Sequence, residues 1–508
     1  EFCIADDASK NQAVRDLLSR HANEDSRIKL VFRKTNGHIS AASNSALDLA
    51  TGEFVALLDN DDLLPEHALF WVAKAIVHNP NIDLIYSDED KVSESGLRFD
   101  PYFKTGWNLD LFYSQNMFSH LGVYRTRLLK EICGFRVGYE GAQDYDLALR
   151  CIEIVSSENI YHVPRILYHW RMHEASTSYS ADAKPYAMLA GEKVLNDHFK
   201  RLNISAKAEL IGFGYRVHYA LPTKKPLVTL IIPTRNGFVL LKRCIESILS
   251  KTTYDNYEII IVDNGSDEAD TINYLNALKS APKVHVLSDD RPFNYSKLNN
   301  NAVSSARGSI LALLNNDVEV ISANWLSEMV SMVLQPGVGA VGASLWYPNK
   351  TLQHGGVILG LGAARVAGHA HHRIPMGHHG YFGRASLISS FSAVSAACLV
   401  VEKKLFQKVG GLNEDDLPVA FNDVDLCLRI LAAGYRNVLN PNATLFHHES
   451  ATRGLEDTPE KQARFDKEVQ YMKERWGDTL LTDPAYSPNL TLDYEDFSLA
   501  WPPRASND

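Results

Sequence analysis

Apolar runs of strand length alternate with amphipathic stretches of helix length along most of this chain. The run Ile310–Leu314 is apolar throughout and stops at Asn315, Asn316 and Asp317. A short apolar run that ends on turn residues is typical of a buried strand. Because strands and helices alternate, the pattern predicts an α/β fold with mostly parallel central sheets. Ligands of such folds bind beyond the carboxyl ends of the strands, where Asp317 would lie.

The same pattern occurs a second time. Residues 50–61, with the sequence ATGEFVALLDND, align without a gap with residues 306–317, ARGSILALLNND. The interval from Asp144 to His169 also equals the interval from Asp423 to His448. We interpret the chain as two tandem domains. The predicted parts are domain 1 over residues 1–221, a linker bounded by two prolines over 222–226, domain 2 over 227–455, and a C-terminal helix and coil over 456–508.

Domain 1 lacks the first strand and helix of this pattern. In domain 2 the strand Leu227–Pro233 and a helix near Phe238–Ser250 precede the strand Glu258–Val262. The chain opens on Glu1–Ala5, which corresponds to Glu258–Val262. A sheet that lacks a strand exposes unpaired backbone groups. We therefore expect the sequence to begin inside domain 1 and that domain to be weakened.

Composition narrows the functional classes. The net charge of −10, with no basic face, argues against nucleic acid as a partner. Six scattered cysteines without a CxxC pair predict buried thiols in a reducing compartment. No apolar run reaches the ~20 residues that span a bilayer, and no signal-peptide pattern is present. We expect a cytoplasmic protein whose membrane contact, at the inner face of the membrane, is peripheral.

Four aspartates sit at the ends of predicted strands. Asp263 and Asp6 suit hydrogen bonds from a ribose or base edge, although a helix cap is the stronger interpretation of either residue taken alone. Asp317 and Asp61 suit a divalent cation that also contacts a diphosphate. Turn formation is the ordinary interpretation of an Asn-Asp pair. Its recurrence after a buried strand favours the metal.

Two further aspartates open predicted helices. Asp423 and Asp144 are candidates for a general base, and a plain capping role is about equally supported. The aspartates two residues later are interpreted as caps. His448 and His169 recur at one distance from these bases, which indicates a metal ligand. Imidazole and carboxylate suit Mn²⁺ or Mg²⁺ when diphosphate oxygens complete the coordination.

Two other patterns are set aside. Residues 360–365, GLGAAR, imitate a dinucleotide fingerprint, but Arg365 occupies the last small-residue position, so a loop is predicted. The histidines near residue 370 are irregularly spaced and lack a companion cysteine, so a polar loop over the cleft is favoured over a zinc site. These are His369, His371, His372, His378 and His379.

The short motifs occur in one order in both halves. They are PTRN at 233–236, VDNGS at 262–266, LLNND at 313–317, FNDVD at 421–425 and FHHES at 446–450, and again DDAS at 6–9, DND at 59–61, QDYD at 143–146 and the histidines His169 and His173. In this order the chain resembles a tandem family-2 glycosyltransferase with the GT-A fold, of the kind that builds bacterial surface polysaccharides such as O-antigen.

The resemblance implies roles for individual residues. Asp423 and Asp144 would be the catalytic bases. The nucleotide would contact Thr234, Arg235, Asp263, Asn300 and Asn316, and in domain 1 Asp6, Asn44 and Asn60. The metal would be held by Asp317, Asn315 and either His447 or His448, and in domain 1 by Asp61, Asp59 and either His169 or His173. Asn315 replaces the first aspartate of the DxD-type motif.

The implied activity is an inverting, Mn²⁺- or Mg²⁺-dependent sugar transfer. The donor would be a nucleotide-diphospho-sugar, and the acceptor an oligosaccharide or a lipid-linked glycan. A sugar nucleotidyltransferase would need a Gly-rich basic loop where residues 233–237 read PTRNG, which argues against that class. A non-catalytic carbohydrate-binding or scaffold role for domain 1, with only domain 2 active, is the alternative.

Overall fold

The computed structural model describes residues 1–172, 185–448 and 458–505. His173 and the end of the FHHES motif lie outside the described residues. The chain divides into two compact units. Unit 1 comprises residues 1–107 and 112–218, and unit 2 comprises residues 108–111 and 219–508. The division falls beside Tyr219, close to the predicted linker.

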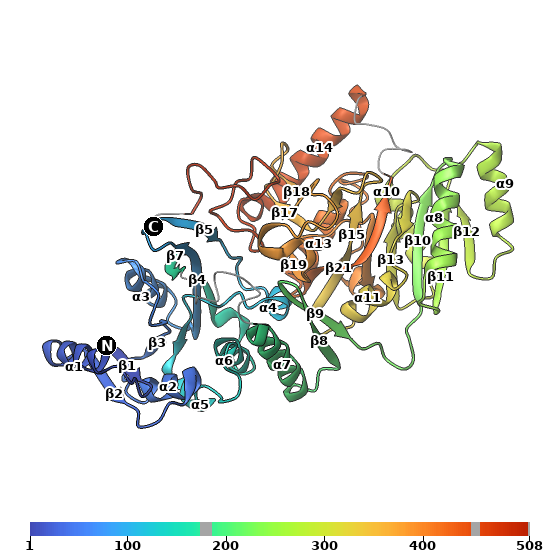
Figure 1. Cartoon of the computed structure of the whole chain (residues 1–508). Helices are drawn as coiled ribbons and strands as arrows, with labels where there is room; N and C mark the ends of the chain where they lie inside the picture. The colour runs from blue at the N-terminus through green and yellow to red at the C-terminus, as the bar shows by residue number, and fades with distance from the viewer. Residues whose placement is uncertain (173–184, 449–457, 506–508) are drawn as a thin grey trace. The chain divides into compact units, whose positions relative to one another are not determined.

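Unit 2 is built on one large mixed sheet (Figure 1). Its parallel part consists of β12 (Val284–Ser288), β11 (Tyr257–Asp263), β10 (Val228–Thr234) and β13 (Ile310–Leu314). Beyond β13 the order is β20 (Cys398–Glu402), β15 (Val338–Trp346), β21 (Arg436–His447) and β14 (Val318–Val320). β20 pairs antiparallel with β13, whereas β15 and β21 are parallel. The predicted parallel arrangement therefore holds for the first part of the sheet.

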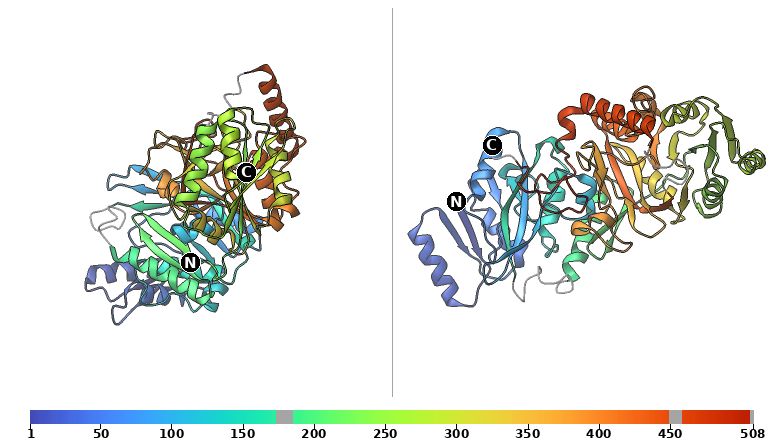
Figure 2. Two further views of the ribbon diagram at one scale, coloured as in Figure 1. Left: turned by 90° about the vertical axis from the view of Figure 1, so that its right-hand side faces the viewer. Right: turned by 90° about the horizontal axis from the view of Figure 1, so that it is seen from above.

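Helices cover both faces of this sheet. The apolar side chains of α8 (Phe238–Lys251), α9 (Ala269–Leu278) and α11 (Trp325–Val333) form one buried cluster with the strands. The helices α10 (Tyr295–Ser305), α12 (Lys403–Lys408) and α13 (Asn422–Ala432) contact β10, β20 and β15 outside that cluster. The charged helix α14 (Pro459–Trp476), red in the figures, lies on the outside of unit 2 (Figure 2).

An insert of short strands connects β15 to β20. It contains β16 (Leu352–His354), β17 (Val357–Leu359), β18 (Ala367–His369) and β19 (Ser389–Phe391). β16 pairs with β15 and β19 pairs with β21, so both extend the main sheet. Residues 360–365 form the loop between β17 and β18, as the sequence predicts.

Unit 1 has the same order of elements in two separate sheets. β1 (Phe2–Asp6) pairs with β2 (Ile28–Phe32), while β3 (Phe54–Ala56), β6 (Val123–Arg125), β4 (Leu84–Val92), β5 (Arg98–Tyr102) and β7 (Ile160–Arg171) form the other sheet. In that sheet only β4 and β7 pair in parallel, and the other pairs are antiparallel, so the prediction of a mostly parallel sheet is wrong for it. Its helices are α1 (Gln12–Glu24), α2 (His38–Leu47), α3 (Ala68–His78), α5 (Thr126–Glu131), α6 (Gln143–Ile152) and α7 (Pro185–Arg201). The short helix α4 (Leu109–Ser114) is divided, since its residues 109–111 belong to unit 2. The hairpin β8 (Ala206–Ile211) and β9 (Gly214–Tyr219) closes this part of the chain.

The two units differ at one strand position. In unit 2, β10 is fully buried and pairs with both β11 and β13. Among the described residues of unit 1, no strand joins β1 to β3. The side chains of β1, the strand that corresponds to β11, are accordingly mostly half-exposed, whereas those of β11 are almost all buried.

Two expectations drawn from composition are tested by the structure. All six cysteines are free thiols, and Cys151, Cys244, Cys398 and Cys427 are buried as predicted. Cys133 is exposed, so the prediction of burial is wrong for it. Among the described residues, no helix is long and apolar enough to cross a bilayer.

The packing of β15 against α13 leaves no room for a side chain at Gly339. A Cβ there would lie 2.2 Å from Ile430 Cγ2 and 3.0 Å from Tyr435 Cβ. Gly339→Ala should therefore lower the free energy of unfolding by about 1–3 kcal/mol, measured by urea unfolding. Combining it with Ile430→Ala should cost less than the sum of the two single changes. Strict additivity would contradict the proposed clash.

Candidate active site

A cavity of about 1010 Å³ opens at the carboxyl edge of the parallel strands of unit 2. The predicted residues that line it are Thr234 and Arg235 at the end of β10, Asn315, Asn316 and Asp317 after β13, Asp423 in α13, and His447 at the end of β21. These side chains come from four separate stretches of the chain. The fold thus brings together most of the site that the sequence predicts for domain 2.

Asp317 and His447 form the centre of this group. Asp317 is buried, and its Oδ1 lies 3.1 Å from Nε2 of His447. That oxygen has no hydrogen-bond partner among the described residues. The other ring nitrogen of His447, Nδ1, lies 2.7 Å from Oε1 of Gln353. In the neutral ring with its proton on Nδ1, the Gln353 oxygen accepts that proton and the Nε2 lone pair lies toward Asp317 and the Asn315 amide.

A carboxylate oxygen and an imidazole lone pair that face each other suit a divalent cation between them. Asn315 adds an amide group beside this pair, with its Nδ2 3.1 Å from His447 Nε2. The Gln353 contact fixes the ring orientation, as outer partners of metal-binding histidines commonly do. The residues present therefore fit a metal site, and His447 is the histidine placed in it.

His448, the alternative favoured by spacing, points elsewhere. Its Nε2 lies 3.3 Å from Oε2 of Glu319, and its ring also contacts Arg243. Neighbouring residues of a strand face opposite sides of the sheet. His447 therefore faces the cavity and His448 does not, which corrects the prediction from spacing.

Asp423 lies in the first turn of α13 and lines the cavity. Its Oδ2 accepts a hydrogen bond from the backbone N–H of Ala396 at 2.9 Å, and its Oδ1 accepts from its neighbour Val424 at 2.9 Å. Phe421, just before the helix, adopts a left-handed backbone conformation with φ of 57°. The carboxylate is thus oriented by backbone donors and still borders the cavity, which suits a base.

The carboxyl ends of β10 and β11 carry the predicted nucleotide contacts. Asn316 Nδ2 donates to Thr234 Oγ1 at 2.9 Å, and Arg235 is exposed in the cavity. Asp263 lies opposite Thr234 in the register of the two strands. Its Oδ1 accepts from the backbone N–H and the hydroxyl of Ser266, so it closes a turn, and it does not cap α9.

Several groups in the cavity have no signal in the sequence motifs. Lys461 and Arg464 reach it from α14, and His354 reaches it from the insert. His369, which the sequence places in a polar loop over the cleft, also borders the cavity. Burial lowers the pKa of His354 well below its ordinary value, so its ring is neutral at pH 7. From the sequence, residues 459–476 are predicted only as a charged helix, and no spacing of residues indicates that this helix lies near the ends of the strands.

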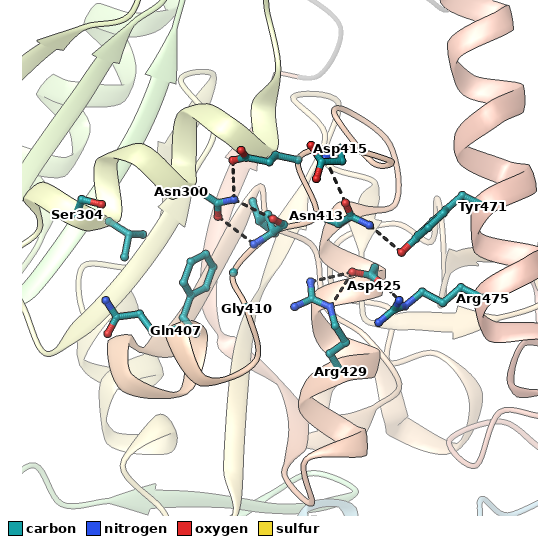
Figure 3. Close-up of a pocket in the computed structure, with 15 residues that line it drawn as sticks. Asn300, Ser304, Gln407, Gly410, Asn413, Asp415, Asp425, Arg429, Tyr471 and Arg475 are labelled. Atoms are coloured by element: carbon teal, nitrogen blue, oxygen red, sulfur yellow. Dashed lines mark hydrogen bonds and ion pairs between the residues drawn. The ribbon is translucent and has the colours of Figure 1, made fainter.

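Asn300 lies away from this cavity, in a second one (Figure 3). Its Nδ2 donates to the carbonyl of Leu412, and its Oδ1 accepts from the N–H of the same residue at 3.0 Å. Asn44 of unit 1 makes the same pair of bonds with the backbone of Phe135. Both asparagines clamp a loop, which corrects the prediction that they contact the nucleotide.

In each unit a second aspartate follows the candidate base by two residues, and the contacts of this aspartate explain its presence. Asp425 pairs with Arg429 one turn later (Figure 3). Its Oδ1 also accepts a hydrogen bond from Nε1 of Trp476 in α14. Asp146 of unit 1 pairs with Arg150 in the same way. These aspartates hold the helices in place through buried ion pairs, rather than capping them as the sequence suggests.

The predicted residues of unit 1 are arranged differently. Asn60 and Asp61 are exposed. Asp59 is half-buried, and burial raises the pKa of its carboxyl, an effect to which the charge of Asp62 adds. Oδ2 of Asp144 accepts from Nδ2 of Asn116 at 2.7 Å. Asp6 closes a turn through the N–H of Ser9 and also pairs with Arg15, much as Asp263 closes its turn.

His169 does not take the place that His447 has in unit 2. Its Nδ1 contacts Oδ1 of Asp90 at 2.5 Å. In the strand register Leu63 lies opposite His169, as Glu319 lies opposite Phe446. The next residue, Trp170, therefore corresponds to His447, and His169 is on the other face of β7. The prediction of His169 as a metal ligand beside Asp61 is corrected accordingly.

The five histidines near residue 370 do not converge on one point. His369 borders the cavity, His372 pairs with Glu495, and His371 stacks on Phe497 with ring centroids 4.0 Å apart. His378 and His379 are exposed. Their separate partners agree with the expectation of a loop rather than a zinc site.

Comparison with known proteins gives a family. The model of glycosyl transferase family 2 matches residues 1–133 and 229–374, which together exceed half of the chain. The family match and the mixed α/β structure confirm the predicted α/β fold class, and the match in two segments agrees with the predicted repeat.

Two curated relatives match nearly the whole chain. An uncharacterized protein of Sinorhizobium fredii, y4gI, is 51% identical over 99% of this chain and 55% of its own length. The O-antigen biosynthesis protein RfbC of Myxococcus xanthus is 35% identical over 98% of this chain and 38% of its own length. The chain thus spans about half or less of these relatives.

Among solved structures, GalNAc-T7 with UDP, GalNAc and Mn²⁺ matches 53% of this chain and 60% of its own chain. The sequence identity is 15% and the TM-score is 0.39.

Because Asn300 bonds a loop and lies outside the first cavity, its substitution should lower the stability of the fold without weakening donor binding. Asn300→Ala leaves the N–H and C=O of Leu412 without their partner, which should lower the free energy of unfolding by about 1–3 kcal/mol. Urea unfolding measures this change. Nucleotide affinity, measured by calorimetry on the folded variant, should stay within about twofold. A large drop in affinity at unchanged stability would restore the original prediction for Asn300.

Proposed function

The chain belongs to glycosyl transferase family 2, and on that premise we propose that unit 2 is an inverting, metal-dependent glycosyltransferase. The proposal rests chiefly on the buried Asp317 oxygen that faces His447 Nε2 at 3.1 Å without a hydrogen-bond partner. This pair lies in the same cavity as Thr234, Arg235 and Asp423. A metal ligand set, nucleotide contacts and a base are the groups that this reaction needs.

Asp317 and His447 would hold the cation, Mn²⁺ or Mg²⁺, with Asn315 beside them. When bound, such a cation stabilises the charge of the departing nucleoside diphosphate. Asn315 contributes no charge, so one carboxylate remains on this side. A site with one imidazole and one carboxylate favours Mn²⁺ over Mg²⁺, because Mg²⁺ prefers oxygen ligands.

We assign the donor contacts to the carboxyl ends of β10 and β13. Thr234, Asn316 and Arg235 border the cavity there, and Asp263 orders the neighbouring turn. Lys461 and Arg464 bring cationic side chains to the same cavity from α14. Their charge favours a diphosphate and opposes its loss before transfer.

Asp423 would take the proton of the acceptor hydroxyl. Its two carboxylate oxygens are held by the N–H groups of Ala396 and Val424, and each oxygen keeps a lone pair free of these bonds. As the hydroxyl oxygen attacks the anomeric carbon opposite the leaving group, the proton passes to this carboxylate. The anomeric configuration is therefore inverted.

The acceptor class is a further part of the proposal. A hydroxyl of an oligosaccharide or a lipid-linked glycan fits the name of the Myxococcus relative, which belongs to O-antigen biosynthesis. Such a reaction would take place in the cytoplasm, with peripheral contact at the inner face of the membrane. Unit 1 carries Asp144 and Asp59 of the same motifs, and we propose that it has a separate role in binding or transfer.

The first experiment measures release of nucleoside diphosphate from UDP-, dTDP- and GDP-sugars, with and without Mn²⁺, in the presence of a glycan acceptor. Asp423→Asn should lower kcat by about a hundredfold or more, because the base is removed while the shape is kept. Asp317→Ala should abolish the metal-dependent part. Asp144→Asn should leave the rate of unit 2 unchanged.

The matched control is Asp270→Asn, an exposed carboxylate of α9 that does not border the cavity. It should retain full activity. Turnover that persists in both Asp317→Ala and Asp423→Asn would contradict the assignment to unit 2. Absence of turnover and of metal-dependent binding with every donor would favour the non-catalytic carbohydrate-binding role.

The choice between the adjacent histidines gives a separate test. His447→Ala should weaken Mn²⁺ binding to unit 2 by at least about tenfold, because it removes the nitrogen that faces Asp317. His448→Ala should leave the affinity unchanged, since that ring contacts Glu319. Isothermal titration with Mn²⁺ measures both. The opposite ranking would return the metal role to His448.

A further inference from the structure

Unit 1 carries polar side chains at two positions beside the strand ends where unit 2 has apolar ones. In the ungapped repeat Asp62 corresponds to Val318. Val55 pairs with Tyr124 as Leu311 pairs with Val401, so His120 corresponds to Ala397, which borders the cavity of unit 2. An acid and an imidazole thus replace two small apolar groups at the carboxyl end of β3.

These replacements converge. Ligand atoms of Asp59, Asp62 and His120 all lie within 4.8 Å of one another. The two aspartates follow β3, and the histidine precedes β6, so the cluster joins two segments of the sheet. We propose that Asp59, Asp62 and His120 form a transition-metal site of unit 1, with a ligand set that differs from the Asp-x-Asp pair of the motif.

A network around His120 fixes its position. Glu89, which is 7% exposed, accepts hydrogen bonds from the N–H of His120 at 3.1 Å and from the hydroxyl of Ser119. The ammonium group of Lys104 donates to Glu89 and to the carbonyl of His120. Glu89 lies opposite Tyr168 as Leu345 lies opposite Leu445, so this network is particular to unit 1.

The aromatic residue Tyr168 contacts both His120 and the second proposed ligand, Asp62. The ring of His120 stacks on Tyr168 with centroids 4.3 Å apart. The hydroxyl of Tyr168 donates to Oδ2 of Asp62 at 2.6 Å, and the N–H of Arg171 donates to Oδ1 at 2.8 Å. Outer contacts of this kind orient metal ligands before the ion binds. Asp62 and His120 are therefore held toward each other by one tyrosine.

The same geometry argues against the motif pair in this unit. Asp61 is exposed, whereas Asp62 is 9% exposed and lies with Asp59. Trp170 occupies the place that His447 has in unit 2, so the imidazole comes from the segment before β6 instead. Two carboxylates this close repel each other unless a cation or a proton lies between them. Two carboxylates with one imidazole favour Mn²⁺ or Zn²⁺ over Mg²⁺ or Ca²⁺.

The test counts bound Mn²⁺ on the full chain by electron paramagnetic resonance of the free ion. The background variant Asp317→Asn removes the proposed site of unit 2, and one Mn²⁺ should remain bound. Adding His120→Gln or Asp62→Asn should weaken that binding at least tenfold. Adding His169→Gln should leave it unchanged, because His169 pairs with Asp90 on the other face of β7.

Several outcomes would overturn the proposal. They are no bound Mn²⁺ in the Asp317→Asn background at about 1 mM metal, the affinity of the weakest specific cation sites, undiminished binding after His120→Gln, and loss of binding after Asp61→Asn but not after Asp62→Asn. Circular dichroism of each variant identifies any that fail to fold. Asp62 also accepts a hydrogen bond from Tyr168, so Asp62→Asn can destabilise the fold. If that variant unfolds, the result for His120→Gln decides the test. The experiment measures Mn²⁺ binding and not turnover of a sugar donor. If the function proposed for unit 2 is wrong, the result for the metal site of unit 1 still holds.

Discussion

The parallel pairing of β10 with β11 on one side and β13 on the other is the constraint on which the site of unit 2 depends. This register puts Thr234 beside Asp263 and brings Asn316 within hydrogen-bond distance of Thr234. Since all these strands end at one edge of the sheet, the polar residues that follow them lie close together in space although they are far apart in the sequence. The burial of β10 keeps the register fixed.

The duplication retained the scaffold more strictly than the chemistry. Both units keep the asparagine clamp and the ion pair between an aspartate and the arginine one turn later. Loss of the asparagine clamp leaves backbone groups unpaired, and loss of the ion pair leaves a buried charge unpaired. Either loss lowers the free energy of unfolding. Around the strand ends, in contrast, Asp62 and His120 of unit 1 stand where unit 2 has Val318 and Ala397.

Some of the site follows from the sequence because strand ends and helix starts have local signals. The apolar run before Asn315 and Asp317, and the acidic start of α13 at Asp423, predict both elements and their place at one edge of the sheet. The roles of Asn300 and Asn44 could not be predicted, because their partners lie in loops far along the chain. For the same reason no sequence rule connects α14 with the cavity.

The sequence by itself determined the duplication, the α/β class and the family, since these depend on periodicity and on the order of short motifs. Only the tertiary structure decided which histidine faces an aspartate. Side chains alternate between the two faces of a strand, so a shift of one residue exchanges the cavity for the opposite face. The pairing of β4 with β7 and of β15 with β21 is irregular, and spacing along the chain therefore does not preserve that alternation. His447 faces Asp317 while His169 faces Asp90 because the register, and not the interval from the base, fixes the direction of each ring.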